Sequence, residues 1–255
     1  MTQLSVNVNK LATLRNSRGK NNPDVQRLSR RILDWGAHGI TVHPRPDGRH
    51  IRIEDVRALN HLVRDYRGPH SHVEFNVEGY PSPDFLELIK EIRPDQVTLV
   101  PDPPEALTSN AGWELTAQEQ LLHEVVRELR RYETRVSLFI DPFQFTQAQC
   151  DALLRIQPDR IELYTERFAD HFDQPDRDSV TTVYEDAARF AHDHGVGVNA
   201  GHDLNQKNLG FLVSKIPWLK EVSIGHALIC EALEQGLQTT IHNYLNILGH
   251  ARHGT

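Results

Sequence analysis

The sequence predicts an α/β fold, a (β/α)8 TIM barrel with extra helices, with residues 1–255 forming a single domain. Two observations lead to this prediction: eight short runs rich in Val, Ile and Leu recur along the chain, and helical periodicity fills the segments between them. This alternation is typical of a parallel sheet. Eight units favour a closed barrel over a doubly wound open sheet, because no GxGxxG follows the first run.

The eight apolar runs are the expected strands. They are LSVNV near Leu4, GITVH ending at His43, HVEFNV around Glu74, QVTLV ending at Val100, RVSLFID ending at Asp141, RIELY ending at Tyr164, GVGVNAG ending at Gly201 and EVSIGH ending at His226.

Helices are expected between the strands. Their ranges are 23–37, 53–65, 83–92, 144–156, 180–194, 208–216 and 227–251, with an extra helix over 116–131 between the fourth and fifth strands. Ser82-Pro83 is a typical helix start, and Gly36 and Gly195 follow expected helix ends.

Composition limits the classes of partner. A formal net charge of −7 argues against nucleic acid and anionic membranes, because both usually require a basic face. No run of 18 apolar residues and no signal peptide is found, and Cys150 and Cys230 have neither disulfide nor metal-ligand spacing. We therefore expect a soluble cytoplasmic protein with small-molecule partners.

Polar and titratable side chains gather where the expected strands end. The carboxyl ends of barrel strands meet at one face, which is where TIM-barrel active sites lie. The residues expected there are Asn7, Asn9, Arg15, Arg18, His43, Arg45, His50, Glu74, Asn76, Thr108, Glu162, Asn199, His202, Gly225 and His226.

These side chains favour acid/base chemistry on a phosphorylated substrate. Arginines and helix N-termini bind phosphate, while imidazoles and a buried carboxyl group transfer protons near neutral pH. A different interpretation is open for single residues. A lone histidine often bonds the backbone, and Glu74 or Glu162 could form a structural ion pair.

The same scaffold is compatible with two alternative functions, a metal-dependent hydrolase and a noncatalytic sensor. A metal-dependent TIM-barrel hydrolase often has HxH at the end of its first strand, where this chain has NVNK, and no other convincing ligand set is found. We therefore expect no metal. A noncatalytic phosphate-ligand sensor would leave the proton-transfer groups without a role.

Six motifs together resemble the pyridoxine 5'-phosphate synthase family. They are VNVNKLATLRNSRG, GITVHPRPDGRHI, the VEF around Glu74, VSLFID, VNAGHDL and IGHALI, in register over nearly the whole chain. The resemblance implies condensation of 3-amino-2-oxopropyl phosphate with 1-deoxy-D-xylulose 5-phosphate to pyridoxine 5'-phosphate, phosphate and water. It also implies no cofactor, and a homo-octamer built as a tetramer of dimers.

The resemblance also implies residue roles. His43 and Glu74 match proton acceptors, and His202 matches a proton donor. The residues that match contacts to the aminoketone phosphate are Asn7, Arg18, Gly225 and His226, and those that match contacts to deoxyxylulose phosphate are Arg45, His50 and Thr108.

The chain departs from the better-known members at four positions. Asn9 and Lys10 stand in place of Asp and His, and we expect them to contact the deoxyxylulose phosphate through a hydroxyl and the phosphate, respectively. Asp203 stands where a glycine commonly follows the NAGH histidine, and we expect it to lie beside a substrate phosphate. Cys230 replaces a small residue in the last phosphate-binding turn.

Overall fold

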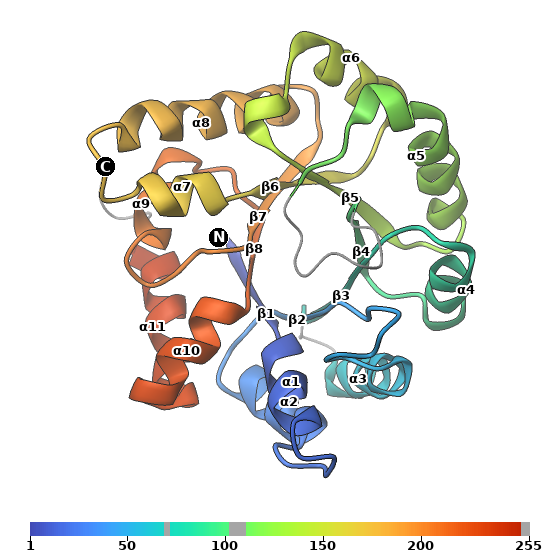
Figure 1. Ribbon diagram of the computed structural model, residues 1–255, viewed down its shortest axis with the longest axis vertical. Coiled ribbons are helices and arrows are strands. Elements are labelled where there is room, and N and C mark those ends of the chain that lie inside the picture. Colours follow the sequence, from blue (N-terminus) through green and yellow to red (C-terminus); the bar gives the residue numbers. More distant parts are fainter. Residues whose placement is uncertain (69–71, 102–110, 251–255) are drawn as a thin grey trace.

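The eight strands form one closed parallel barrel in the computed structural model, which describes residues 1–68, 72–101 and 111–250 (Figure 1). Each strand pairs with the next along the chain, and the last closes on the first. The barrel prediction is confirmed. The strands are β1 (Gln3–Asn7), β2 (Gly39–Val42), β3 (Glu74–Gly79), β4 (Gln96–Leu99), β5 (Arg135–Ile140), β6 (Arg160–Tyr164), β7 (Gly197–Gly201) and β8 (Glu221–Ile224).

The helices surround the barrel as an outer ring (Figure 1). They are α1 (Asn9–Asn16), α2 (Val25–Asp34), α3 (Ile53–Tyr66), α4 (Pro83–Ile92), α5 (Leu115–Arg130), the 3-10 helix η1 (Pro142–Gln144), α6 (Gln147–Ile156), α7 (Glu166–His171), α8 (Arg177–Asp193), α9 (Leu209–Lys215), α10 (His226–Gln235) and α11 (Leu237–His250).

Three helix predictions need correction. The helix expected as an extra element, α5, is the regular partner of β4 and β5, and the extra helices are α1, α7 and α10. The short polar helices α1 and α7 were not predicted, because neither has an apolar stripe long enough to stand out. The expected C-terminal helix is two helices, α10 and α11, separated by Gly236, which has a φ of 83°.

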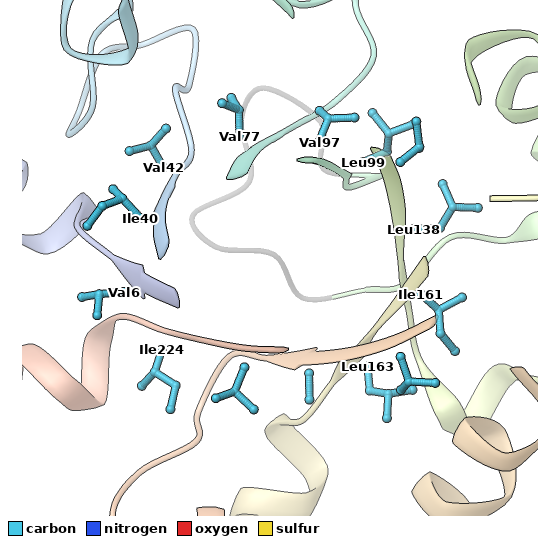
Figure 2. Packing of buried hydrophobic residues seen from close by; sticks show 14 of the residues in the cluster. Val6, Ile40, Val42, Val77, Val97, Leu99, Leu138, Ile161, Leu163 and Ile224 are labelled. Carbon is cyan, nitrogen blue, oxygen red and sulfur yellow. The ribbon is translucent and has the colours of Figure 1, made fainter. Parts of the chain in front are cut away.

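Apolar strand residues face outward, against the helices. In Figure 2 the labelled Val, Leu and Ile side chains lie on the outer side of the strands. Side chains alternate along a strand, so the inward positions of β3 are Glu74, Asn76 and Glu78, between the buried Phe75 and Val77. The apolar core is therefore the layer between strands and helices.

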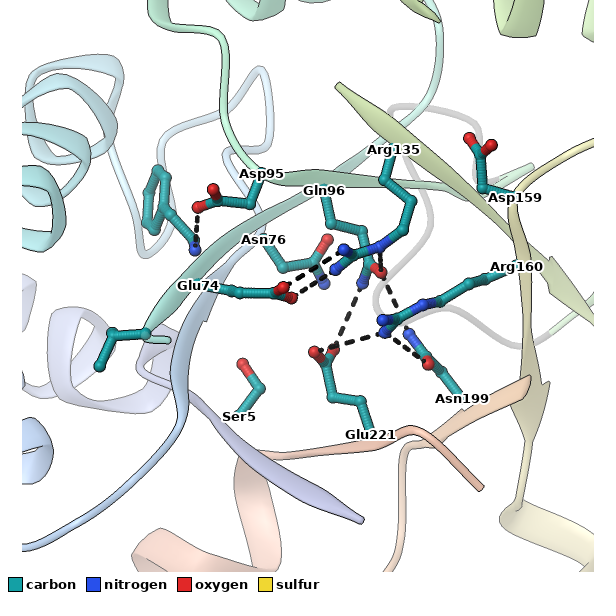
Figure 3. Close-up of polar contacts among 12 residues, drawn as sticks. Ser5, Glu74, Asn76, Asp95, Gln96, Arg135, Asp159, Arg160, Asn199 and Glu221 are labelled. Atoms are coloured by element: carbon teal, nitrogen blue, oxygen red, sulfur yellow. Dashed lines mark hydrogen bonds and ion pairs between the residues drawn. The ribbon is translucent and has the colours of Figure 1, made fainter. Parts of the chain in front are cut away.

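The barrel interior is polar. Hydrogen bonds cross it from β4 to the opposite strands, with Gln96 Nε2 donating to Glu221 and Asn199 Nδ2 donating to Gln96 Oε1, both over 3.3 Å. TIM barrels usually fill this space with bulky apolar residues. Here it holds a layer of paired charges and amides near the amino ends of the strands, drawn in Figure 3.

Candidate active site

A cavity of about 580 Å³ opens at the carboxyl ends of the strands. Its volume lies within the usual range for small-molecule sites. Thirteen residues were predicted to contact the substrates or to transfer protons: the ten with roles implied by the resemblance, and Asn9, Lys10 and Asp203. Ten of these thirteen line the cavity, and they come from segments far apart in the sequence. They are Asn7, Asn9, Lys10, His43, Arg45, His50, His202, Asp203, Gly225 and His226.

Glu74 does not lie in this cavity, so the prediction that it shares a site with His43 and His202 is wrong. Glu74 is the first residue of β3, and both of its carboxylate oxygens accept hydrogen bonds from the Arg135 guanidinium (Figure 3). Arg135 also donates from Nε to Gln96 Oε1 over 2.9 Å. Glu74 is thus part of an ion pair at the amino end of the barrel.

Glu78 is the β3 carboxylate that lines the cavity. It lies four residues after Glu74 on the same face of the strand, about 13 Å further along at the usual rise per residue. Its Oε2 accepts a hydrogen bond from Asn7 Nδ2 at 3.3 Å and lies 3.7 Å from His43 Nδ1. The signal in the sequence is Gly79-Tyr80-Pro81, which ends the strand directly after Glu78.

Among the described residues, Arg18 does not join the cavity lining and is exposed in the turn after α1. Thr108 lies outside the described residues. The neighbouring Arg15 is buried and bonded to both carboxylate oxygens of Asp55, at 2.5 and 2.8 Å. Arg15 therefore fastens α1 to α3.

The two histidines of the second strand end are held neutral. Burial, with Arg45 and His50 nearby, lowers the pKa of His43 to about 3. Burial and Arg45 lower the pKa of His50 to about 4. His50 Nδ1 accepts a hydrogen bond from the Ile51 backbone N over 2.9 Å, so its remaining hydrogen is on Nε2. His43 is therefore unprotonated at neutral pH and a weaker base than an ordinary histidine, and His50 can donate to an anion.

The burial of His43 and His50 predicts that the folded protein loses stability at acid pH. The unfolded chain takes up protons on these imidazoles near pH 6.5, whereas the native state does so only at the lower pKa values. The unfolded state then binds more protons, so the free energy of unfolding falls as pH decreases from 6.5 towards 4. His43→Gln should reduce this slope by up to about 1.4 kcal/mol per pH unit.

Denaturant unfolding at a series of pH values checks this result. His61→Gln on α3 is the matched control, because His61 is 81% exposed, and it should leave the slope unchanged. An equal slope in wild type and His43→Gln would contradict this prediction, because it would mean that His43 binds protons in the folded protein as readily as in the unfolded chain.

Asp203 orients His202. Its carboxylate oxygen lies 2.5 Å from His202 Nδ1, and this hydrogen bond lowers the pKa of Asp203. His202 has a φ of 75°, an uncommon backbone conformation that is found at functional sites. The Tyr164 ring packs edge-on against the imidazole, with centroids 5.1 Å apart. Asp203, which was expected beside a phosphate, lines the cavity and pairs with this imidazole.

Two regions of the cavity suit anions. One is the start of α10, where Gly225 precedes His226, and a Cβ on Gly225 would lie 3.0 Å from Asn7 Cβ. The N-terminus of a helix attracts anions through its free N–H groups. The other region carries the positive charges of Lys10, Arg45 and Arg49. Two phosphate groups could therefore be held at separate points.

Glu162 lines the cavity, as expected from its place near the end of the sixth strand, where either a role in the site or a structural ion pair was open. Its carboxyl group is 3% exposed, and Thr98 lies 3.3 Å from its Oε2. Burial, followed by the charge of Glu221, raises the pKa of Glu162 well above the usual range of a carboxyl group. Glu78, by contrast, has Asn7 and His43 as polar partners. The site therefore holds one carboxyl group that is deeply buried and one that is paired with polar side chains.

The described part of the chain contains neither a cluster of metal ligands nor a membrane-spanning helix. No group of three or more His, Cys, Asp and Glu residues there is arranged to hold a metal ion. None of the helices in residues 1–68, 72–101 and 111–250 is long and apolar enough to cross a membrane.

The sequence is similar to one family of known proteins over nearly its whole length. Residues 4–250 match the family model described as "Pyridoxal phosphate biosynthesis protein PdxJ". The chain is 48% identical over 244 residues to a pyridoxine 5'-phosphate synthase of Parabacteroides distasonis, covering 96% of this chain and 98% of that protein. It is 46% identical over 248 residues to one of Cytophaga hutchinsonii, covering 97% and 99%. Neither finding supports the alternatives of a hydrolase or a sensor.

Solved structures resemble the chain in fold. Phosphoribosyl anthranilate isomerase from Thermotoga maritima superposes with a TM-score of 0.60 at 13% identity, covering 98% of this chain and 99% of that one. A mutant tryptophan synthase α-subunit from Pyrococcus furiosus gives a TM-score of 0.58 at 16% identity, covering 97% of each chain. These likenesses agree with the barrel architecture.

Proposed function

The chain belongs to the pyridoxal phosphate biosynthesis protein PdxJ family, and from this premise we propose how its cavity carries out the pyridoxine 5'-phosphate synthase reaction. The reaction condenses 3-amino-2-oxopropyl phosphate with 1-deoxy-D-xylulose 5-phosphate and yields pyridoxine 5'-phosphate, phosphate and water. Both substrates carry a phosphate, and the amine of one must reach the ketone of the other.

The observation that carries the proposal is that His43, Glu78 and His202 line one cavity between two anion-binding regions. The start of α10 at Gly225 and His226 receives the aminoketone phosphate. Lys10, Arg45 and His50 receive the deoxyxylulose phosphate, and Asn9 fixes this side by accepting a hydrogen bond from the His43 backbone N over 3.0 Å. The reacting carbons then meet between the two phosphates.

The three titratable side chains have distinct roles in proton transfer. Neutral His43 accepts a proton from the attacking amine, and Glu78 beside it accepts protons during ring closure. His202, with Nδ1 bonded to Asp203, donates a proton to a departing oxygen. Loss of water and phosphate requires repeated transfers of this kind. Asn7 bonds Glu78 and so holds the carboxylate toward the substrate.

A direct assay tests the function. Purified protein incubated with both substrates should form pyridoxine 5'-phosphate, measured by chromatography against the authentic compound. A folded protein that forms none, in a mixture where a related synthase does, would overturn the proposal.

We also propose that the protein acts in the cytoplasm as an octamer, a tetramer of dimers. Both cysteines are free, which fits a reducing compartment. Leu14 on α1 and Leu233 on α10 are 54% and 79% exposed, and these two helices lie side by side, which fits a contact between subunits. Light scattering should give eight times the chain mass of 29.2 kDa. A monomer at working concentration would contradict this assembly.

A further inference from the structure

A line of buried polar side chains crosses the barrel interior and reaches the cavity at Thr98 and Glu162. Thr98 Oγ1 lies 3.3 Å from Glu162 Oε2 and 3.2 Å from Asn76 Oδ1. On its other side Asn76 Nδ2 donates to Thr41 Oγ1 over 3.4 Å, and Thr41 bonds the hydroxyl of Ser5 at 2.7 Å. These five residues come from five strands, and each is at most 3% exposed. Ser5 and Asn76 are labelled in Figure 3.

Counting hydrogens along this line constrains Glu162. The Thr98 hydroxyl has one hydrogen and two neighbouring acceptors, Asn76 Oδ1 and Glu162 Oε2. The Asn76 amide donates one hydrogen from Nδ2 to Thr41, so its oxygen faces Thr98 and requires a donor. If Thr98 supplies it, then Glu162 can bond Thr98 only as a carboxylic acid whose O–H donates to Oγ1. The Thr98 hydroxyl and the Glu162 acid then each have an acceptor for their hydrogen.

The surroundings of Glu162 agree with a neutral carboxyl group. Burial and the nearby charge of Glu221 both raise its pKa. The carboxyl group is also fixed in place, because a Cβ on Gly201 would lie 2.2 Å from Glu162 Oε1. Only a glycine at this point of β7 leaves room for the acid.

We propose that Asn76 and Thr98 are a positioning pair that keeps Glu162 protonated, because Asn76 takes the single hydrogen that Thr98 could otherwise give to a Glu162 carboxylate. Neither side chain needs to touch substrate for this role. The biological role of this pair rests on the proposed function: a protonated Glu162 in the cavity could donate a proton during ring closure.

Other titratable and charged groups face the same interior and must be held constant in a test. Toward the amino ends of the strands these are Glu74, Arg135, Arg160 and Glu221, and toward the carboxyl ends they are His43, Glu78 and His202. None of the variants below changes any of them.

The test is the pKa of Glu162 in the ligand-free protein, measured by carbon NMR of carboxyl-labelled glutamate and assigned by the signal lost in Glu162→Gln. Replacing a buried amide by an apolar side chain ordinarily raises the pKa of a nearby carboxyl group. We expect the opposite for Asn76→Leu. The freed Thr98 hydrogen then bonds the carboxylate, which should lower the pKa by about one to two pH units.

Control variants test whether the change in the Glu162 pKa depends on the Thr98 hydroxyl. In a Thr98→Val background, Asn76→Leu should no longer lower the pKa. Ser137→Ala changes a buried hydroxyl of β5 that has no hydrogen-bond partner among the described residues, and it should leave the pKa unchanged. Asn76→Ala is measured alongside in case the larger side chain prevents folding.

A rise in the Glu162 pKa in the Asn76 variants, or an equal fall without the Thr98 hydroxyl, would overturn the proposal. A rise is also the result expected if the Asn76 amide has the reverse orientation and Thr98 already donates to an ionised Glu162. Because this titration uses no substrate, its failure is separate from failure of the synthase assay.

Discussion

Glu78→Gln should fold normally, bind both phosphates and lose at least about 10²-fold in turnover, the usual minimum when an acid/base group is removed. The substitution keeps the shape of the side chain and the contact with Asn7, but the amide cannot accept a proton. It also removes the charge 3.7 Å from His43. Steady-state kinetics should therefore show a fall in kcat with little change in KM.

The matched control is the same substitution four residues earlier in the same strand. Glu74→Gln changes the other inward carboxylate of β3, which bonds Arg135 and does not line the cavity. Its turnover should stay within about twofold of wild type, because acid/base effects need hydrogen-bond reach of the substrate. If Glu74→Gln lost turnover and Glu78→Gln did not, the assignment made from the structure would be wrong.

Glu74→Gln should instead lower stability. Its carboxylate and the Arg135 guanidinium are only 25% and 24% exposed, so the pair is partly shielded from water. Removing one partner leaves a cation near the amino end of the barrel without its bidentate acceptor. Hydrogen bonds to charged groups contribute about 1.5–3 kcal/mol, and partial exposure reduces this, so we expect a loss of about 1–2 kcal/mol in the free energy of unfolding.

Denaturant unfolding of wild type and Glu74→Gln at pH 7 measures this loss of stability. Arg135→Met should be destabilised by a similar amount, and the double variant should lose less than the sum of the two single losses, since the residues are in direct contact. Additive losses would mean that the pair contributes nothing as a pair.

Much of the fold could be predicted because apolar runs mark the strands whatever lies between them. The exact match at Pro83–Ile92 comes from a clear signal, the Ser82 hydroxyl accepting a hydrogen bond from Phe85 N with proline at the first helical position. The helices that were missed, α1 and α7, are short and lie beside the site. Asn9, Lys10 and Arg15 of α1 were recognised as site residues and not as part of a helix, and no residue of α7 was singled out at all.

The misplaced carboxylate has a physical cause. Glu74 and Glu78 lie near opposite ends of one strand, on the same face. Because the barrel interior is polar, each is a carboxylate at an inward position of the same alternating pattern. An inward position with a period of two identifies both residues equally well. Only the point where the strand ends decides which one reaches the cavity, and strand boundaries are the least predictable part of a sequence. Interior contacts such as Thr98 to Glu162 depend on the register of several strands.

A crystal structure with 1-deoxy-D-xylulose 5-phosphate bound is the most direct test of this site. We expect the phosphate against Lys10, Arg45 and His50, with the hydroxyl and ketone oxygens of the ligand within hydrogen-bond reach of Glu78 and His43. A ligand bound elsewhere, or one whose nearest carboxylate is Glu74, would contradict this expectation.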